Sequence, residues 1–166
     1  FIGRLETNKG IERIIKAFGE IKTQFKYEVH FVGDGPCESS ITSSKNSNFI
    51  IHGFQNKDYV KDILKQSDFL LLPSDSEGFP KVVAESMCYG CVPIVTDVSS
   101  ISQYVNAKNG FLLNYHNITN HLTDCIRKIL VSNPEKFDNF KILGHEVSKK
   151  FTFERYTYRL LNEILN

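Results

Sequence analysis

The sequence predicts an α/β domain: a Rossmann-like parallel sheet of about six strands flanked by helices, with extra helices at the carboxyl end. Short apolar runs alternate with amphipathic stretches along the chain, an order typical of strands and helices that build a parallel sheet. One run, Phe69–Leu72, is continuously apolar, as expected of a strand covered on both faces. With 166 residues, 41% of them apolar, the chain suits one domain spanning 1–166.

The first half of the chain shows both kinds of pattern. Between residues 9 and 25, isoleucine and phenylalanine recur every three or four positions, which predicts one face of a helix. Thr7 or Asn8 is placed to cap its start. The elements expected here are a strand at the chain start, a helix over 9–25, a strand over 27–32 that ends in the turn cluster 33–36, a strand over 49–51 and a helix over 58–66.

The second half begins with the Phe69–Leu72 strand, which Pro73 bounds. The helix that follows, 81–89, is expected to end near Gly90, since a glycine just past the last turn is a common helix stop. The last helices have no strands between them, so we expect them to form an appendage to the finished sheet. The remaining elements expected are strands over 92–95 and 111–113, and helices over about 118–131, 135–149 and 153–165.

Composition excludes several classes of function. The net charge is +1 and no long basic run occurs, so we expect no binding to nucleic acid or, from bulk charge, to an anionic membrane. No stretch approaches the roughly 18 consecutive apolar residues of a transmembrane helix. The start, Phe1–Arg4, lacks both signal-peptide features and a methionine. We therefore expect a fragment of a longer protein.

The four cysteines fit a reducing compartment, and the expected location is the cytoplasm. Only Cys88 and Cys91 are suggestively spaced, but a zinc site needs about four ligands and no second pair stands nearby. A redox pair is the alternative for this spacing. We favour two small buried residues that flank a helix end.

In an open parallel sheet, ligands bind beyond the carboxyl ends of the strands. The residues directly after each apolar run are therefore expected to share one rim of the sheet. These residues are Gly3, Arg4, Lys9 and Gly10 after the first run, 33–36 after the second, Gly53, Phe54 and Gln55 after the third, and 74–79 after the fourth.

The fourth of these loops is the richest and leads into a helix. Pro80 stands where a first-turn proline is favoured, and the free N–H groups of a helix start suit a phosphate. Glu77 precedes the helix and Glu85 lies about one turn inside it, so both carboxylates are expected to face one cleft. Carboxylates repel phosphate but accept hydrogen bonds from sugar hydroxyls. Arg4 and Lys9 would supply the positive charge that a diphosphate needs.

Several of these residues also have a purely structural interpretation. The negative charge of Glu77 could interact favourably with the dipole of the helix that follows, which stabilises a helix by about 0.3–1 kcal/mol. Glu85 could be a solvated helix residue, but its helix is apolar on most sides, and an acid on a mostly buried helix is costly without a partner. We therefore favour a functional role for Glu85. The pair Gly33-x-Gly35 is a weak dinucleotide motif, because Glu38 stands where a third glycine belongs.

Several stretches occur together, in one order, along nearly the whole chain. They are Gly3-Arg4-Leu5 with Lys9-Gly10; Val32-Gly33-Asp34-Gly35-Pro36; His52-Gly53-Phe54; Pro73-Ser74; Glu77-Gly78-Phe79-Pro80-Lys81-Val82-Val83-Ala84-Glu85-Ser86-Met87; and Gly90, Pro93 and Ile94-Val95. Together they resemble the C-terminal domain of family-4 glycosyltransferases, which is one half of a GT-B fold, and they include that family's spacing of two glutamates.

The resemblance implies retaining transfer of a hexosyl or N-acetylhexosaminyl group from a nucleotide-diphosphate sugar, without a metal ion or other cofactor. UDP is preferred over GDP, because the Glu-Gly-Phe-Pro variant resembles enzymes that use UDP-N-acetylhexosamines. Glu77, Arg4 and Lys9 are the implied catalytic residues. By the same resemblance, Arg4 and Lys9 would contact the diphosphate, and Glu77, with Gly78 beside it, would contact the sugar. The N–H groups of Phe79, Lys81 and Val82 would donate to sugar or phosphate oxygens, and Glu85 would bind the ribose. Gln55 would lie near the base, and Gly33 and Gly35 would border the pocket.

The sequence departs from the family pattern at two positions. Pro80 stands where many members have glycine, which removes one backbone donor. Ser86 replaces an alanine, and the expected effect is on packing. No Asp-x-Asp pair is available to hold a metal, and the stretch Asp75-Ser76-Glu77 is assigned to sugar contact.

The resemblance further implies an N-terminal, acceptor-binding domain that this chain lacks. A glycan, polysaccharide or lipid-linked acceptor would bind there, with peripheral association of the full-length enzyme at the inner face of the membrane. The chain alone is expected to bind donor weakly and to transfer no sugar. Two alternatives stay open: a non-catalytic nucleotide-binding regulatory module, and a dinucleotide oxidoreductase, which the missing third glycine disfavours.

Overall fold

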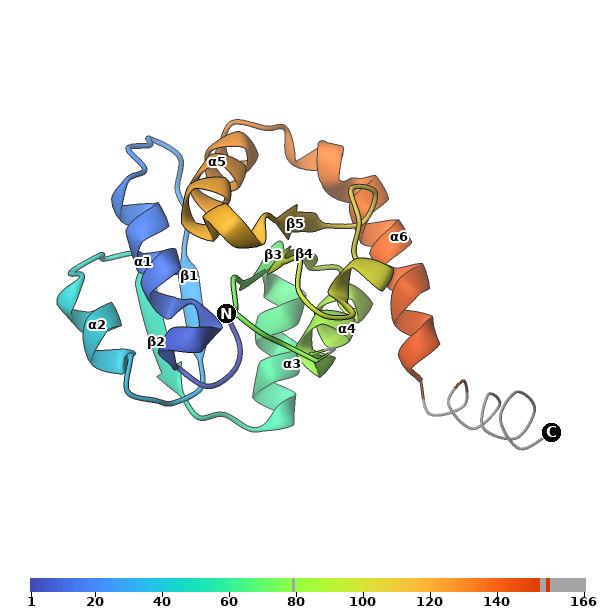
Figure 1. The fold of residues 1–166 in the computed structure, drawn as a ribbon, viewed down its shortest axis with the longest axis horizontal. Helices are drawn as coiled ribbons and strands as arrows, with labels where there is room; N and C mark the ends of the chain where they lie inside the picture. Colours follow the sequence, from blue (N-terminus) through green and yellow to red (C-terminus); the bar gives the residue numbers. More distant parts are fainter. Residues whose placement is uncertain (79, 153–154, 156–166) are drawn as a thin grey trace.

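A computed structural model describes residues 1–78, 80–152 and 155. Helices and strands alternate along them, as the sequence predicts (Figure 1). Phe79 and nearly all of the helix expected over 153–165 lie outside the described residues. The helices and strands are α1 (Ile11–Gly19), β1 (Val29–Val32), α2 (Glu38–Ser43), β2 (Phe49–Gly53), α3 (Lys57–Gln66), β3 (Phe69–Leu72), α4 (Lys81–Cys88), β4 (Val92–Thr96), β5 (Phe111–Leu113), α5 (Ile118–Leu130) and α6 (Asp138–Ser148). Short 3-10 turns are η1 (Thr7–Lys9), η2 (Ile101–Gln103), η3 (Tyr115–Asn117), η4 (Pro134–Phe137) and η5 (Lys149–Phe151).

The strands form two parallel sheets instead of one sheet of about six strands. β1 pairs with β2, and β4 lies between β3 and β5. The strand expected at the chain start contributes a single bridge, from Ile2 to Val32. Gly3 then takes a φ of +147°, which leaves extended geometry and turns the chain away. The parallel α/β fold is confirmed, with five strands in the part of the chain that the structure describes.

One apolar core connects both sheets. Phe31 of β1, Leu70 of β3 and Ile94 of β4 are buried in it, together with side chains of α1 and α5. α1 and α5 pack against each other from opposite halves of the chain (Figure 1). β3 is buried along most of its length, so its continuous apolar run is covered on both faces as expected. The core therefore holds strands of both sheets in a fixed relation, which lets the loops at their carboxyl ends pack on one another.

The start and end of α1 differ from the prediction. The helix begins at Ile11, its N-cap is Gly10 with a φ of +82°, and Thr7–Lys9 form the separate turn η1. The prediction that Thr7 or Asn8 caps the helix is therefore wrong. The helix ends at Gly19, yet Ile21 still packs against the core. The apolar spacing marked the buried side chains correctly but not the point where the helix stops.

Two further helices differ from expectation. α2 was not expected, because its sequence is rich in serine and threonine, which are weak helix formers, and only Ile41 in it is buried. Pro80 is the N-cap of α4 and not its first helical residue, since its ψ of 123° is still extended. The predicted stop at Gly90 is confirmed by a φ of +82°, the left-handed conformation that glycine allows.

The two closely spaced cysteines have different environments. Cys88, the last residue of α4, is exposed, so the expectation that both are buried is wrong for it. Cys91 is buried, and its thiol donates to the carbonyl oxygens of Leu64 at 2.9 Å and Ser67 at 3.0 Å. Burial raises the pKa of Cys91 to about 12. Because the thiolate is the reactive form, this pKa argues against a redox pair.

A chain of four polar side chains connects β1, β2 and α3. His30 Nδ1 lies 2.8 Å from His52 Nε2, and the two rings stack with centroids 5.1 Å apart. Glu28 lies 3.2 Å from His30 Nε2, and the Tyr59 hydroxyl lies 2.8 Å from His52 Nδ1. With both imidazoles neutral, each donor in the chain faces an acceptor: Tyr59 donates to His52, His52 to His30, and His30 to Glu28. The pKa of His52 is lowered, first by burial and next by the charge of His30.

This lowered pKa predicts a pH dependence of stability. An unfolded chain binds a proton at His52 with the ordinary pKa of 6.5, more readily than the folded chain does. The free energy of unfolding should therefore be highest above that pH and fall as the pH drops through 6.5 toward the folded pKa. We expect His52→Leu to lose less stability than the wild type between about pH 7 and pH 5 in urea unfolding. The exposed His116→Leu should behave like the wild type, and an unchanged slope in His52→Leu would contradict the assignment.

Candidate site at the carboxyl rim of the strands

The loop that starts the chain packs directly on the loop after β3. The Asp75 N–H donates to the Asn8 carbonyl at 2.8 Å. A Cβ atom added to Gly10 would lie only 2.1 Å from the Pro73 carbonyl oxygen, so no side chain fits at that position. The turn after β1 is equally close, because a Cβ on Gly33 would lie 1.9 Å from the Gly3 carbonyl oxygen. The Gly33 N–H also donates to the Gly53 carbonyl at 2.8 Å, so the structure brings all four predicted loops together at one rim.

An ion pair joins the loop at the chain start to the loop after β3. Lys9 Nζ lies 2.7 Å from Glu77 Oε1, and the side chains are 24% and 10% exposed. Both residues were predicted for the site, Lys9 for a diphosphate and Glu77 for a sugar. The structure places them in contact with each other. A lysine ammonium has three donors, so Lys9 can hold Glu77 and still donate to a ligand oxygen.

Arg4 lies on the same rim but in another set of contacts. Its guanidinium lies 3.3 Å from Glu6 and 3.3 Å from Asp34, the residue between Gly33 and Gly35. The Arg4 side chain is 62% exposed, and it makes no contact with Lys9 or Glu77 in the part of the chain that the structure describes. The Arg4 guanidinium therefore lies at the border of the site and is exposed to solvent, while the Lys9 ammonium lies inside the site.

α4 begins directly after the loop that follows β3, so its free backbone N–H groups belong to this rim. Lys81 is the first helical residue, and no side chain caps the helix start. Glu85 lies one turn further and is exposed, with no side-chain partner in the described residues. The expectation of an acid on a buried surface is wrong for Glu85, because its side of the helix faces solvent. Ser86 is buried and donates to the Val83 carbonyl at 2.9 Å, which fits the expected effect on packing.

The rim after β2 carries Gln55 and Phe54, both of which the sequence predicted at this rim. The Gln55 side chain donates to the His52 carbonyl at 2.7 Å and is only partly buried. Its neighbour Phe54 is 79% exposed, an unusual environment for a phenylalanine. Gly78, beside Glu77, has open space where a Cβ would stand, so packing does not require glycine there.

Arg13 is the charged residue of the rim that no motif identified. It lies four residues after Lys9, in the first turn of α1, and contacts both Pro73 and Asp75. In the helix that the sequence predicts over 9–25, a spacing of four would put Lys9 and Arg13 on one side, and this was the signal available in the sequence. The described residues contain no group of three histidine, cysteine or acidic side chains that could hold a metal ion. Within the same residues, no helix is long and apolar enough to cross a membrane.

The chain matches the family described as glycosyl transferases group 1 over residues 1–132. The chain belongs to this family. It is 31% identical to an uncharacterised glycosyltransferase of Methanocaldococcus jannaschii over 160 residues, which are 93% of this chain and 44% of that protein. It is 36% identical over 102 residues to a putative teichuronic acid biosynthesis glycosyltransferase of Bacillus subtilis, covering 61% of this chain and 25% of that protein.

The solved structures of glycosyltransferases confirm the fold. The Anabaena protein HepE in complex with UDP and glucose superposes with a TM-score of 0.82 at 18% identity, over 99% of this chain and 46% of that one. At this identity the likeness concerns the fold alone. The chain spans less than half the length of the curated relatives that it matches, 44% of one and 25% of the other.

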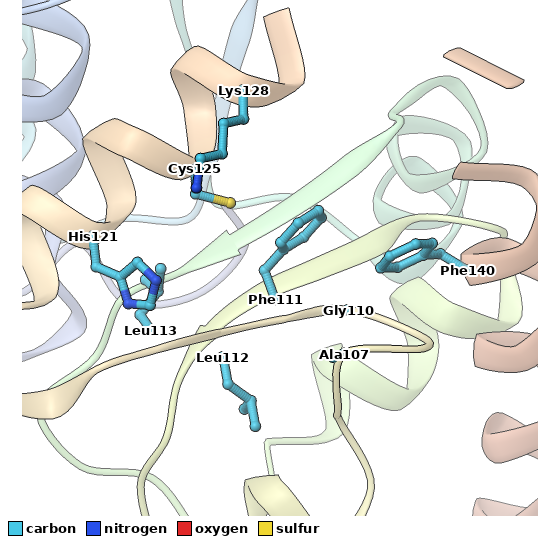
Figure 2. Close-up of a pocket in the computed structure, with 9 residues that line it drawn as sticks. All are labelled: Ala107, Gly110, Phe111, Leu112, Leu113, His121, Cys125, Lys128 and Phe140. Carbon is cyan, nitrogen blue, oxygen red and sulfur yellow. The ribbon is translucent and has the colours of Figure 1, made fainter. Parts of the chain in front are cut away.

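Two cavities of this glycosyltransferase domain include neither Lys9 nor Glu77 in their lining. One, of about 310 Å³, lies beside the edge strand β5, where Phe111 stacks with Phe140 of α6 (Figure 2). His121, Cys125 and Lys128 of α5 line its other side (Figure 2). The second, of about 380 Å³, is polar and lies between α1 and the start of α5. Its lining is Arg13, Lys16, Tyr115, His116, Asn117, Ile118, Thr119 and Asn120.

The close approach of Gly10 to Pro73 yields a test of the rim. We expect Gly10→Ala to lower the free energy of unfolding by at least roughly 1–3 kcal/mol, because both its positive φ and the nearby carbonyl oppose a side chain. Gly19→Ala is the matched control, since no atom lies within 4 Å of its Cβ position and alanine favours the helix. Urea unfolding measures both variants. Equal stability of Gly10→Ala and wild type would contradict the packing of the two loops.

Proposed function

We propose that the chain is the donor-binding half of a retaining glycosyltransferase. It would hold a nucleotide-diphosphate sugar, with UDP as the nucleotide, for transfer to a glycan, polysaccharide or lipid-linked acceptor. One observation carries the proposal: Lys9 and Glu77, from different loops, meet at the carboxyl rim of a parallel sheet beside the uncapped start of α4. Ligands of such sheets bind at this rim.

The leaving group of the proposed reaction is a nucleoside diphosphate. Breaking the bond to the sugar develops negative charge on the diphosphate, and preplaced donors lower the barrier by stabilising that charge. Lys9, the N–H groups at the start of α4 and the exposed Arg4 are such donors. In this proposal they replace a metal ion.

The two glutamates would have separate ligands. The Glu77 carboxylate is held by Lys9 and would accept hydrogen bonds from sugar hydroxyls, while Lys9 meets the diphosphate. Glu85 is open to solvent one turn along α4 and would accept from the ribose hydroxyls. Gln55, and the turn containing Gly33 and Gly35, would border the base.

The relatives support this choice of ligands. HepE was solved with UDP and glucose, and the Bacillus subtilis relative is named for teichuronic acid biosynthesis. The Glu77-Gly78-Phe79-Pro80 stretch keeps N-acetylhexosamine donors among the candidates. The relatives extend beyond the region that the chain matches, which supports an acceptor site outside it. We place the activity in the cytoplasm at the inner face of a membrane, where a lipid-linked acceptor is accessible.

Isothermal titration calorimetry with paired ligands tests the roles of the glutamates. Glu85→Ala should weaken UDP and UDP-glucose alike, because both carry the ribose. Glu77→Ala should weaken UDP-glucose but barely change UDP, since only the donor carries the sugar. Each lost hydrogen bond to a charged group should cost about 1.5–3 kcal/mol. Glu146→Ala, on α6, is the control, and equal effects of Glu77→Ala on both ligands would refute the division.

The same calorimetry separates the classes of function. We expect the chain to bind UDP or UDP-sugar and not NAD, and to show no transfer to acceptor on its own. Tight NAD binding with none for UDP or GDP would favour an oxidoreductase. Binding of UDP without any difference from UDP-sugar would favour a regulatory nucleotide module.

The proposed replacement of a metal by Lys9 and Arg4 has its own test. We expect the dissociation constant of UDP-glucose to be the same in excess EDTA and in excess magnesium, because fixed cations of the chain meet the diphosphate. Lys9→Ala should weaken binding in both buffers. A dissociation constant that rises strongly on chelation would contradict this part of the proposal.

A further inference from the structure

We infer that Arg13 is a positioning residue that holds the loop 73–78, and through it Glu77, in the geometry that receives the sugar of the donor. The inference rests on the proposed function of that loop. Arg13 belongs to no motif of the sequence, and within the loop assigned to the sugar it contacts only the Pro73 carbonyl and the Asp75 carboxylate. Its role would be exerted through Asp75 and Pro73.

The contacts of Arg13 are forked. Its Nη1 donates to the Pro73 carbonyl at 2.9 Å, and its Nη2 donates to the Asp75 carboxylate at 2.5 Å. The Arg13 side chain is 25% exposed. A planar guanidinium can make two such contacts at once, whereas a lysine ammonium lacks this fixed fork. Arg13 thereby joins α1 to two points of the loop, separated by one residue.

Asp75 is held from a second side. Its N–H donates to the Asn8 carbonyl at 2.8 Å, so the chain on both sides of Lys9 contacts the loop. Glu77 follows Asp75 by two residues and has no hydrogen-bond partner other than Lys9 in the part of the chain that the structure describes. The position of its carboxylate therefore depends on Lys9 and on the backbone that Asp75 anchors.

The two ion pairs of the rim have different tasks. Lys9 and Glu77 are both assigned to the donor, so their contact must be shared or exchanged when a diphosphate sugar enters. Arg13 has no assigned ligand and contacts Asp75 through Oδ1 alone, so this pair can stay in place while the donor binds. A single ion pair that solvent still reaches contributes little to overall stability, so the expected consequence of losing Arg13 concerns the position of the loop more than unfolding.

The experiment compares ligand binding and amide exchange in Arg13 variants of the chain. Arg13→Ala should weaken UDP-glucose or UDP-N-acetylglucosamine roughly tenfold, the effect of losing one charged hydrogen bond, and should weaken UDP much less. Arg13→Lys should fall between Arg13→Ala and wild type. Arg13→Ala combined with Asp75→Ala should bind UDP-sugar no more weakly than Arg13→Ala alone, because Arg13→Ala already removes the contact with Asp75. The amide of Asp75 should exchange faster in Arg13→Ala.

Arg127→Ala is a matched control. Arg127 also contacts a carboxylate, Asp124, and a backbone carbonyl, that of Glu20, both at 3.4 Å and near the other end of α1. It should match Arg13→Ala in melting temperature without changing donor binding or Asp75 exchange. Wild-type UDP-sugar affinity in Arg13→Ala would overturn the inference. If the wild-type chain binds no UDP-sugar, the proposed function fails, and unchanged Asp75 exchange in Arg13→Ala would still overturn the positioning role.

Discussion

The backbone contact between Gly10 and Pro73 is the constraint on which the candidate site depends. The two segments meet so closely that only glycine fits, and the meeting fixes where α1 starts. Lys9 precedes that point and reaches Glu77, and Arg13 follows it by one turn and reaches Asp75. A contact between main-chain atoms thus determines which charges of two distant segments become neighbours.

Much of this arrangement could be predicted from the sequence because it depends on repeating patterns. The apolar run of β3 has a length and continuity that fit a covered strand, and Lys9 and Glu77 lie in motifs that recur in a known family. The environment of Glu85 could not be predicted this way. Its apolar neighbours suggested burial on all sides, but a helix of eight residues leaves one side open. Which side is open is decided by packing with other elements.

Arg13 illustrates a different limit of prediction from sequence. Its partners lie 60 and 62 positions away, and one of them is a backbone carbonyl, which has no signature in the sequence. α2 was missed for the opposite reason, because its serine-rich sequence has little intrinsic preference for helix and the surrounding loops impose it. In both cases tertiary contacts, which local patterns do not encode, determine the outcome. The parts of the rim are also stabilised by different contacts. Ion pairs join the loop at the chain start to the loop after β3, whereas Gln55 donates to the carbonyl of His52, whose ring stacks on His30.

The uneven burial of the cysteines has a practical consequence for studying this domain. The sequence contains four thiols, and Cys88 is exposed while the other three are buried. Burial raises the pKa of Cys91 and Cys125 to about 12, which keeps them protonated and unreactive in neutral solution. A maleimide dye would therefore attach at one place, the last residue of α4. The wild-type chain therefore needs no substitution for labelling at a single site, which lies at the end of α4 opposite the rim.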